Sequence, residues 1–259
     1  MEEKEFIWRP YGDYLTQSNV RSLMDRCGVK TYEDLIYFST HCPNMFWGAC
    51  LEDLGVEWDK PYIQVLDSSR GIAWTRWFLG GKINIVRNCL DRHVRDGKGG
   101  KTVFFWEGAD GTSREITYQE LYNLVSKISK SLKKIGIGKG DTVGIYMSFT
   151  PESIALMLAA MKIGAVPLLI MSGFGAQALV ERLNIVGAKA LFTSDGFPLR
   201  NKTIELKNVI HEALEDAPTL KKVVVIERAG IKTVMTQPRD IFWSEFLDLG
   251  ACSYSKYLP

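Results

Sequence analysis

The chain has 259 residues, of which 46% are hydrophobic and 24% charged, with 32 basic against 30 acidic side chains. This composition is typical of a folded protein and excludes an intrinsically disordered or collagen-like chain. The formal net charge of +2 gives no electrostatic reason for a polyanionic partner, so we expect no binding of nucleic acid.

Residues 1–95 are rich in aromatic side chains and poor in long periodic segments. Five of the seven tryptophans fall in this part of the chain, and their large apolar area favours a role as packing anchors. Short helices are predicted over 20–28 and 31–42, the second capped by Thr31 with Asp34 three positions on. We therefore expect an N-terminal extension of short helices and loops that packs on a larger body.

Residues 96–259 alternate between apolar strands and amphipathic helices. Thr117 and Glu120 form a capping box, and Thr150 followed by Pro151 begins another helix. Nearly continuous apolar strands separated by helices are typical of a parallel sheet. The predicted fold class is α/β, a mostly parallel sheet with helices on both faces, preceded by the Trp-rich segment. Strands are predicted at 101–108, 141–148, 165–171, 188–194 and 220–228, and helices at 117–135, from 150 onward, 176–186 and 206–216.

The compartment follows from the cysteines and the N-terminus. The five cysteines are scattered and form no C-x-x-C pair, which indicates thiols of a cytoplasmic protein. The acidic first residues are unlike a signal peptide. One apolar window, 154–174, is long enough to cross a membrane, but Lys162 and Pro167 divide it into a helix and a strand. We expect no membrane partner.

The residues alone show no catalytic constellation and no metal-ligand spacing. Segment 97–102 is not a phosphate-binding P-loop, because Arg95 stands where its first glycine would be. Two segments follow predicted strands, where ligands bind in open parallel sheets. Met171–Gly175 is either a ligand loop or an ordinary tight turn. Segment 195–202, with Arg200 and Lys202, is either a phosphate-binding edge or a charged, solvated loop.

Several stretches in fixed order resemble the AMP-forming acetyl-CoA synthetases of the acyl-adenylate-forming family. Trp77–Asn84 and Asn88–His93 are similar to that family's W-F-x-G-G-x-L-N and N-C-L-D-R-H motifs. The resemblance runs from about residue 8 to the end of the chain and continues through Phe105–Gly108, Ile116–Leu121, Lys139–Met147, Pro151 with Glu152, Ile163–Val166 and Gly173 with Phe174.

The resemblance implies an enzyme that activates a carboxylic acid with ATP to an acyl-adenylate and then transfers the acyl group to coenzyme A (CoA). For the full-length family it implies CoA and ATP with Mg²⁺ as cofactors. The family's F-G-G-F loop along the CoA channel corresponds to Met171, Ser172, Gly173 and Phe174, of which two depart from the pattern. Its arginines near the CoA phosphates fall at Leu199 and Lys202, with Arg200 adjacent. The implied CoA-binding residues are therefore Met171, Ser172, Gly173, Phe174, Arg200 and Lys202.

The family's phosphate loop, T-x-E motif, ribose-binding aspartate and C-terminal lysine do not occur in this chain. We therefore assign no catalytic residue and no metal ligand. We expect the N-terminal portion of an acyl-CoA synthetase for a short, acetate-like acid, inactive alone and completed by a C-terminal half in cis or in trans. Self-association is an expected liability of an incomplete sheet. The alternative is a stand-alone CoA- or nucleotide-binding regulatory half-domain, or one subunit of a split synthetase.

Overall fold

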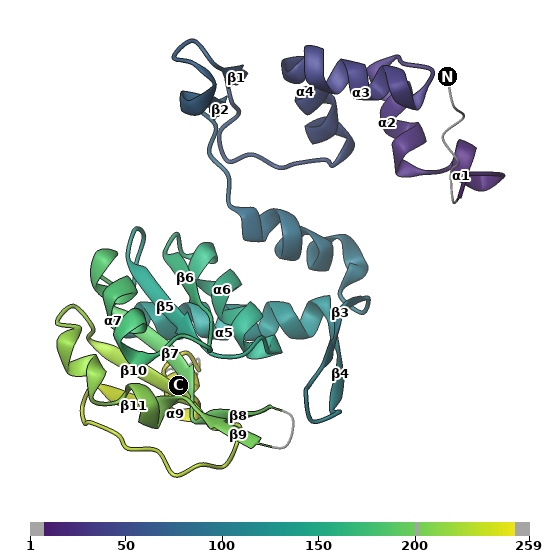
Figure 1. Ribbon diagram of the computed structural model, residues 1–259. Coiled ribbons are helices and arrows are strands. Elements are labelled where there is room, and N and C mark those ends of the chain that lie inside the picture. Colours follow the sequence, from purple (N-terminus) through teal and green to yellow (C-terminus); the bar gives the residue numbers. More distant parts are fainter. Residues whose placement is uncertain (1–7, 200–201, 252–259) are drawn as a thin grey trace, which may run out of the picture. The chain divides into compact units, whose positions relative to one another are not determined.

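A computed structural model describes residues 8–199 and 202–251. The chain divides into two compact units, Met1–Ile83 and Asn84–Pro259, which are described separately below (Figure 1). The sequence predicts a domain boundary after residue 95, and that boundary stays a prediction.

The first unit contains short helices and one antiparallel pair of strands. The capping box predicted at Thr31 is present: its hydroxyl accepts from the Asp34 N–H at 3.0 Å, and the Asp34 carboxylate accepts from the Thr31 N–H at 3.3 Å. In the strand pair, Leu66 lies opposite Trp77. The elements are α1 (Asp13–Thr16), α2 (Asn19–Cys27), α3 (Tyr32–His41), α4 (Pro43–Asp53), β1 (Gln64–Asp67), the 3₁₀ turn η1 (Ile72–Trp74) and β2 (Arg76–Leu79).

Four of the five tryptophans of this unit are exposed, and the expectation that they anchor the extension on a larger body stays a prediction. Within the described part of the unit, only Met24 and Leu35 are buried apolar side chains. Trp74 is 71% exposed, and Trp8, Trp47 and Trp77 are exposed as well. The rings instead contact one another, as Trp47 and Trp77 do edge to face with centroids 6.0 Å apart.

The second unit is built on a five-stranded sheet in the order β11–β10–β7–β5–β6 (Figure 1). Every neighbouring pair in it is parallel. The central strands are almost wholly buried, which explains their continuous apolar sequences. The strands are β5 (Thr142–Tyr146), β6 (Val166–Ile170), β7 (Ala190–Ser194), β10 (Lys222–Ile226) and β11 (Asp240–Phe242).

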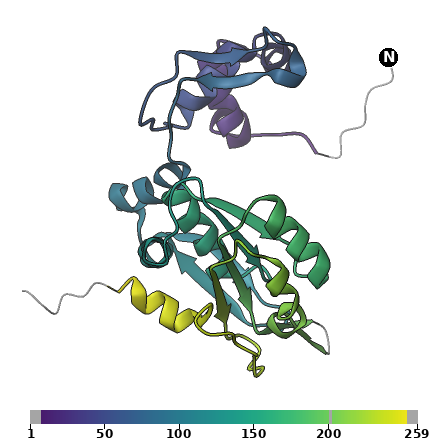
Figure 2. The same ribbon diagram turned by 90° about the vertical axis from the view of Figure 1, so that its left-hand side faces the viewer.

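Helices cover both faces of this sheet, which confirms the predicted fold class (Figure 2). On one face, Phe192 of β7 packs against Phe246 of α9, with ring centroids 5.0 Å apart. On the other face, a methyl group placed at Gly144 of β5 would meet Leu183 of α7 at 2.7 Å. The helices are α5 (Tyr118–Lys134), α6 (Pro151–Lys162), α7 (Ala176–Ile185), α8 (Lys207–Ile210) and α9 (Trp243–Leu249).

Helix α5 follows its sequence pattern closely. The Thr117 hydroxyl accepts from the Glu120 N–H at 3.2 Å, and the Glu120 carboxylate accepts from the Thr117 N–H at 2.8 Å. Its predicted apolar stripe is buried at Leu121, Val125, Ile128 and Leu132. The apolar window 154–174 divides into α6 and β6 as expected, and none of the described helices has the length and apolar character needed to cross a membrane.

Several short elements were not predicted. They include β4 (Ser113–Thr117), which pairs antiparallel with β3 (Thr102–Glu107), the strand predicted at 101–108. They also include β8 (Gly196–Leu199) and β9 (Lys202–Glu205), which form a second antiparallel ribbon. Ahead of β3 lie the π-helical turns η2 (Arg87–Asp91) and η3 (Val94–Lys98). The single helix expected over 206–216 is two pieces, α8 and the 3₁₀ turn η4 (Ala213–Asp216). The break lies between Ile210 and Ala213.

Candidate functional site

The carboxyl ends of β5, β6 and β7 lie at one edge of the sheet, where their following loops meet. β5 leads into the N-terminus of α6, β6 into the loop Met171–Gly175, and β7 into Asp195 and the β8–β9 ribbon. This is the edge at which open parallel sheets bind ligands.

Tyr146, the last residue of β5, supports the loop Met171–Phe174 through its side-chain hydroxyl. The buried Tyr146 hydroxyl donates to the Phe174 carbonyl oxygen at 2.6 Å and lies 3.3 Å from the Ser172 carbonyl oxygen. Burial raises the pKa of Tyr146, so the hydroxyl keeps the proton that it donates. The Arg182 guanidinium of α7 lies 4.2 Å from the centroid of the Phe174 ring. The backbone of the loop is thus fixed while Met171, 73% exposed, stays open to solvent.

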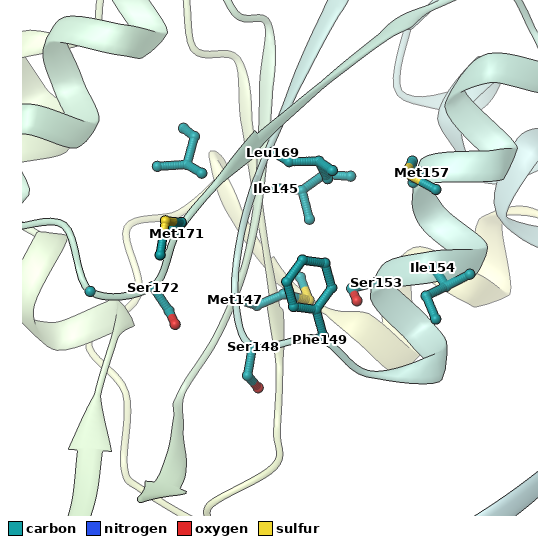
Figure 3. Close-up of a pocket in the computed structure, with 12 residues that line it drawn as sticks. Ile145, Met147, Ser148, Phe149, Ser153, Ile154, Met157, Leu169, Met171 and Ser172 are labelled. Carbon is teal, nitrogen blue, oxygen red and sulfur yellow. The ribbon is translucent and has the colours of Figure 1, made fainter. Parts of the chain in front are cut away.

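Part of this loop lines an apolar cavity of about 330 Å³ (Figure 3). The close-up shows Met171 and Ser172 on one side of it and α6 residues such as Met157 on the other. No charged side chain is among the lining residues, so the cavity suits an apolar group. They are Ile145, Met147, Ser148, Phe149, Ser153, Ile154, Met157, Leu169, Ile170, Met171, Ser172 and Gly173.

The loop also leads directly into a helix start that no side chain caps. Gly175 is the N-cap of α7 and makes no side-chain hydrogen bond to it. The first N–H groups of such a helix attract an anion. A methyl group added at Gly173 or Gly175 would meet no heavy atom within 4 Å, so the main chain is accessible at both positions. These features suit the approach of a phosphate-bearing or carbonyl-bearing ligand.

A second cavity, of about 200 Å³, lies beside the first and shares Ser148 and Phe149 with it. The Trp106 indole N–H donates to the Phe149 carbonyl oxygen at 2.9 Å, and the Arg228 guanidinium lies 5.0 Å from the Trp106 ring centroid. The Ser148 hydroxyl is buried without a hydrogen-bond partner among the described residues. The other lining residues are Glu107, Gly108, Ala109, Phe197, Pro198 and Leu199.

The β8–β9 ribbon brings the second group of predicted residues to this region. Lys202 is exposed and pairs across the ribbon with Leu199, which lines the second cavity. Arg200 lies outside the described residues. The ribbon is anchored by Asp195, 1% exposed, whose carboxylate accepts from the N–H groups of Gly196, Arg228, Ala229 and Ile231 at 2.7–3.1 Å.

A buried ion cluster lies outside both cavities. The Lys207 ammonium, fully buried, is 3.0 Å from the Asp240 carboxylate and donates to the Val234 carbonyl oxygen at 2.8 Å. Burial lowers the pKa of Lys207. Burial alone would raise the pKa of Asp240, but hydrogen bonds from Arg239, from the Thr236 N–H and from Lys207 outweigh it and lower that pKa. Every member has protein partners, so the cluster is structural.

The structure therefore collects Met171, Ser172 and Gly173 at one cavity and places Phe174 beside it. Sequence reasoning missed Tyr146, Phe149, Trp106 and Arg228. Only Tyr146 had a local signal, as the last residue of an apolar strand before a helix cap. Among the described residues, no three His, Cys, Asp or Glu side chains gather closely enough to hold a metal ion.

Two family models match the chain. The model described as AMP-binding enzyme matches residues 90–244, and the model described as acetyl-coenzyme A synthetase N-terminus matches residues 32–89. The first corresponds closely to the second structural unit, and the second to much of the first unit.

Curated relatives are similar over most of this chain. Acetyl-coenzyme A synthetase of Methanothrix thermoacetophila is 37% identical over 248 residues, which are 95% of this chain and 37% of the relative. The 3-hydroxypropionyl-coenzyme A synthetase of Sulfurisphaera tokodaii is 36% identical over 234 residues, 89% of this chain and 35% of the relative. The chain thus spans about a third of the length of these relatives.

A solved structure shares the fold. The acetoacetyl-CoA synthetase from Streptomyces lividans superposes with a TM-score of 0.82 at 22% identity, covering 93% of this chain and 37% of that one.

Proposed function

The chain belongs to the family of AMP-binding enzymes, and we propose that it supplies the N-terminal portion of an AMP-forming acyl-CoA synthetase, where it binds CoA. The observation that carries this proposal is the loop Met171–Phe174, fixed by Tyr146 at the carboxyl edge of the sheet and followed by an uncapped helix start. The relatives named as CoA synthetases, and the order of the two matched family models, support it.

The residues fit CoA in three respects. Gly173 leaves the main chain of the loop accessible, and the apolar cavity beside it suits an aliphatic arm. Lys202 on the exposed ribbon supplies positive charge for phosphate groups. Arg200, which belongs to the same set of proposed CoA-binding residues, adds a second positive charge. In the complete enzyme, CoA contributes the thiol that accepts the acyl group. The part played by this chain is to hold and orient CoA.

ATP and Mg²⁺ fit less well. The chain contains no Ser/Thr/Gly-rich phosphate loop, and the described residues form no acidic cluster for a cation. We therefore derive no adenylation step from this chain. Activation of a short, acetate-like acid is proposed for the enzyme completed by its remaining portion, in cis or in trans, in the cytoplasm. The domain boundary after residue 95, between the N-terminal extension and the first part of the large α/β domain, is part of the same proposal.

Calorimetric titration with CoA tests the proposal, with Gly173→Leu as the diagnostic variant. A Cβ added at Gly173 meets no heavy atom within 4 Å, and a leucine there would cover the loop surface at which we propose that CoA binds. We expect saturable binding to the wild-type chain, at least a tenfold loss in Gly173→Leu, and a smaller, salt-dependent loss in Lys202→Ala. Gly100→Leu, also in open space but ahead of β3, is the matched control and retains binding.

Two outcomes would contradict the proposal. The first is a folded wild-type chain that gives no saturable CoA signal. The second is equal loss in the Gly100 and Gly173 variants, which would show that the loop is not the site. Acid-dependent ATP–pyrophosphate exchange by the isolated chain should stay at background. Robust exchange would refute the proposal that this chain needs a further portion of the enzyme for activity.

A stand-alone CoA-binding regulatory protein is the second candidate, favoured by the single continuous cluster of buried apolar residues in the second unit. Such a protein would bind CoA at the same site. In contrast to the first proposal, its affinity for CoA should not change when the remaining portion of a synthetase is added.

A further inference from the structure

A third cavity lies on the second unit, separate from the candidate CoA site. Its volume is about 370 Å³, and it shares no lining residue with the two cavities at the carboxyl edge of the sheet. Four of its lining residues belong to the π-helical turns η2 and η3, and one belongs to α5. Such turns are rare and are frequently found at functional sites. The lining residues are Arg87, Asp91, Val94, Arg95 and Tyr122.

The π-helical segment is anchored to the core on its inner side. Val86 and Leu90 are fully buried in the hydrophobic core of the unit. The Asn84 side-chain amide donates to the carbonyl oxygen of Lys162, the last residue of α6, at 3.0 Å. Its side-chain oxygen accepts from the Val86 N–H at 3.1 Å. The wall that η2 contributes to the cavity is therefore built on the core.

The charges around the cavity favour an anion. The Lys162 ammonium lies 2.6 and 2.7 Å from the two oxygens of the Asp91 carboxylate, and it lies 4.9 Å from the centroid of the Tyr122 ring. Lysine and aspartate in this ion pair neutralise each other, and both side chains are more than 70% buried. The remaining charges among the lining residues are the guanidinium groups of Arg87 and Arg95.

The contacts that these arginines make within the protein are compatible with a ligand. Arg95 pairs with Asp96 through Nε at 3.2 Å, and both side chains are about half exposed. Exposed ion pairs of this kind contribute little to stability, so an anion can compete with the aspartate. A guanidinium also has five N–H donors, so Arg87 and Arg95 can each bind a ligand alongside a contact within the protein.

The spacing of the two arginines favours an extended ligand. Arg87 and Arg95 are eight positions apart, which corresponds to about 12 Å at the rise of an α-helix. Guanidinium groups bind phosphate oxygens in a bidentate way. A chain of phosphate groups can contact both arginines, whereas a single phosphate reaches both only if the two side chains converge on it. The cavity has the size of a small-molecule site.

We propose that this cavity binds a small linear polyphosphate, as a di- or triphosphate chain, between Arg87 and Arg95. Tyr122 and the ion pair of Asp91 with Lys162 form the wall between the two arginines. The inference does not rest on the proposed CoA site, because the two sites share no residue.

Calorimetric titration of the complete chain with inorganic tripolyphosphate, without Mg²⁺ and at fixed ionic strength, tests the proposal. We expect saturable one-to-one binding, with orthophosphate at least tenfold weaker. Arg95→Gln should weaken the binding of tripolyphosphate at least fivefold. Lys98→Gln is the matched control, because it removes a positive charge from the exposed side of the same turn η3 without lining the cavity. It should change the affinity less than twofold.

A variant with the opposite sign separates ligand binding from damage to the fold. Asp91→Asn removes the carboxylate that repels the anion and leaves the Lys162 ammonium without its counter-charge. It should therefore tighten the binding of tripolyphosphate at least threefold, although it removes an ion pair. Damage to the fold would weaken binding instead.

NMR spectroscopy of the complete chain locates the ligand. Tripolyphosphate should shift the amide signals of Val94 and Tyr122 and leave that of Lys202, on the β8–β9 ribbon, in place. A saturating concentration of CoA should not change the affinity for tripolyphosphate.

Five outcomes would overturn the inference. They are the absence of saturable binding, equal affinity for orthophosphate, equal losses in Arg95→Gln and Lys98→Gln, weaker binding by Asp91→Asn, and displacement of tripolyphosphate by CoA with signal shifts at Lys202. The CoA titration of the wild-type chain is read separately. Loss of the CoA signal alone would refute the proposed function and leave this site standing.

Discussion

Replacing Asp240 by asparagine should destabilise the second unit by about 3–5 kcal/mol, because it leaves a buried ammonium without its counter-charge. Asp240 is fully buried and accepts from Lys207 at 3.0 Å, from the Arg239 Nε at 2.6 Å and from the Thr236 N–H at 3.0 Å. An asparagine oxygen retains part of this hydrogen bonding but none of the charge. Lys207, itself fully buried, would then have only neutral partners within reach: the new amide oxygen, the Val234 carbonyl oxygen and the His211 ring.

The paired design isolates the charge interaction. Lys207→Met alone should cost less, about 2–3 kcal/mol, because Asp240 keeps Arg239 and the Thr236 N–H. The double variant Lys207→Met/Asp240→Asn should cost clearly less than the sum of the two single changes, by about 2 kcal/mol, since no uncompensated ammonium remains.

Urea unfolding followed by far-UV circular dichroism measures all three variants at pH 7. Additivity of the two single changes within about 0.5 kcal/mol would refute the reasoning, because it would mean that Lys207 and Asp240 do not interact. A loss below about 1 kcal/mol in Asp240→Asn would refute it as well, because that side chain would then not compensate a buried charge.

Three further changes test other parts of the second unit. Asp195→Ala should lower the free energy of unfolding by about 3 kcal/mol, because several backbone N–H groups lose their acceptor. Gly250→Ala should cost about 1–3 kcal/mol, because its methyl group would lie 2.5 Å from the Lys127 carbonyl oxygen of α5. Burial lowers the pKa of His211 below its ordinary value of 6.5. The contribution of neutral His211 to the free energy of unfolding should therefore be fully present above pH 6.5 and be lost as the pH decreases toward the lowered pKa. The variant His211→Gln should show a smaller loss of stability over the same pH range.

Each of these changes has a matched comparison. Asp195→Asn keeps an acceptor and should lose less stability than Asp195→Ala in urea unfolding; equal losses would count against the carboxylate contacts. Gly100→Ala adds the same methyl group in open space and should be neutral in thermal unfolding, and a comparable loss there would contradict the packing argument. For His211, unfolding free energies at pH 7.5 and 5.5 decide the sign, and a parallel decline in both proteins would show that another group is responsible.

The sequence predicted the elements whose signals are local. Buried strands such as β5 and β7 are continuous apolar runs, and α5 has its cap, stripe and terminating Gly136 in sequence order. The break between α8 and η4 has no such signal. The chain has a helical pattern throughout 206–216, yet α8 ends at Ile210 and η4 begins at Ala213.

The candidate site was predicted only in part for the same reason. The resemblance placed the Met171–Phe174 loop, and the strand pattern placed it after β6. Its support by Tyr146 and the neighbouring cavity depends on which strands lie side by side, because Tyr146 and Phe174 are 28 positions apart. Trp106 and Arg228 meet only through the fold, so no spacing in the sequence joins them.

The carboxylate of Asp195 couples two segments that are otherwise separate in the chain. It begins the β8–β9 ribbon after β7 and, at the same time, ties down the turn at 228–231 after β10. One side chain thus accepts hydrogen bonds from two loops that follow adjacent strands. Through Arg228 in the second loop, whose guanidinium lies 5.0 Å from the Trp106 ring centroid, the base of the ribbon is connected to the wall of the second cavity.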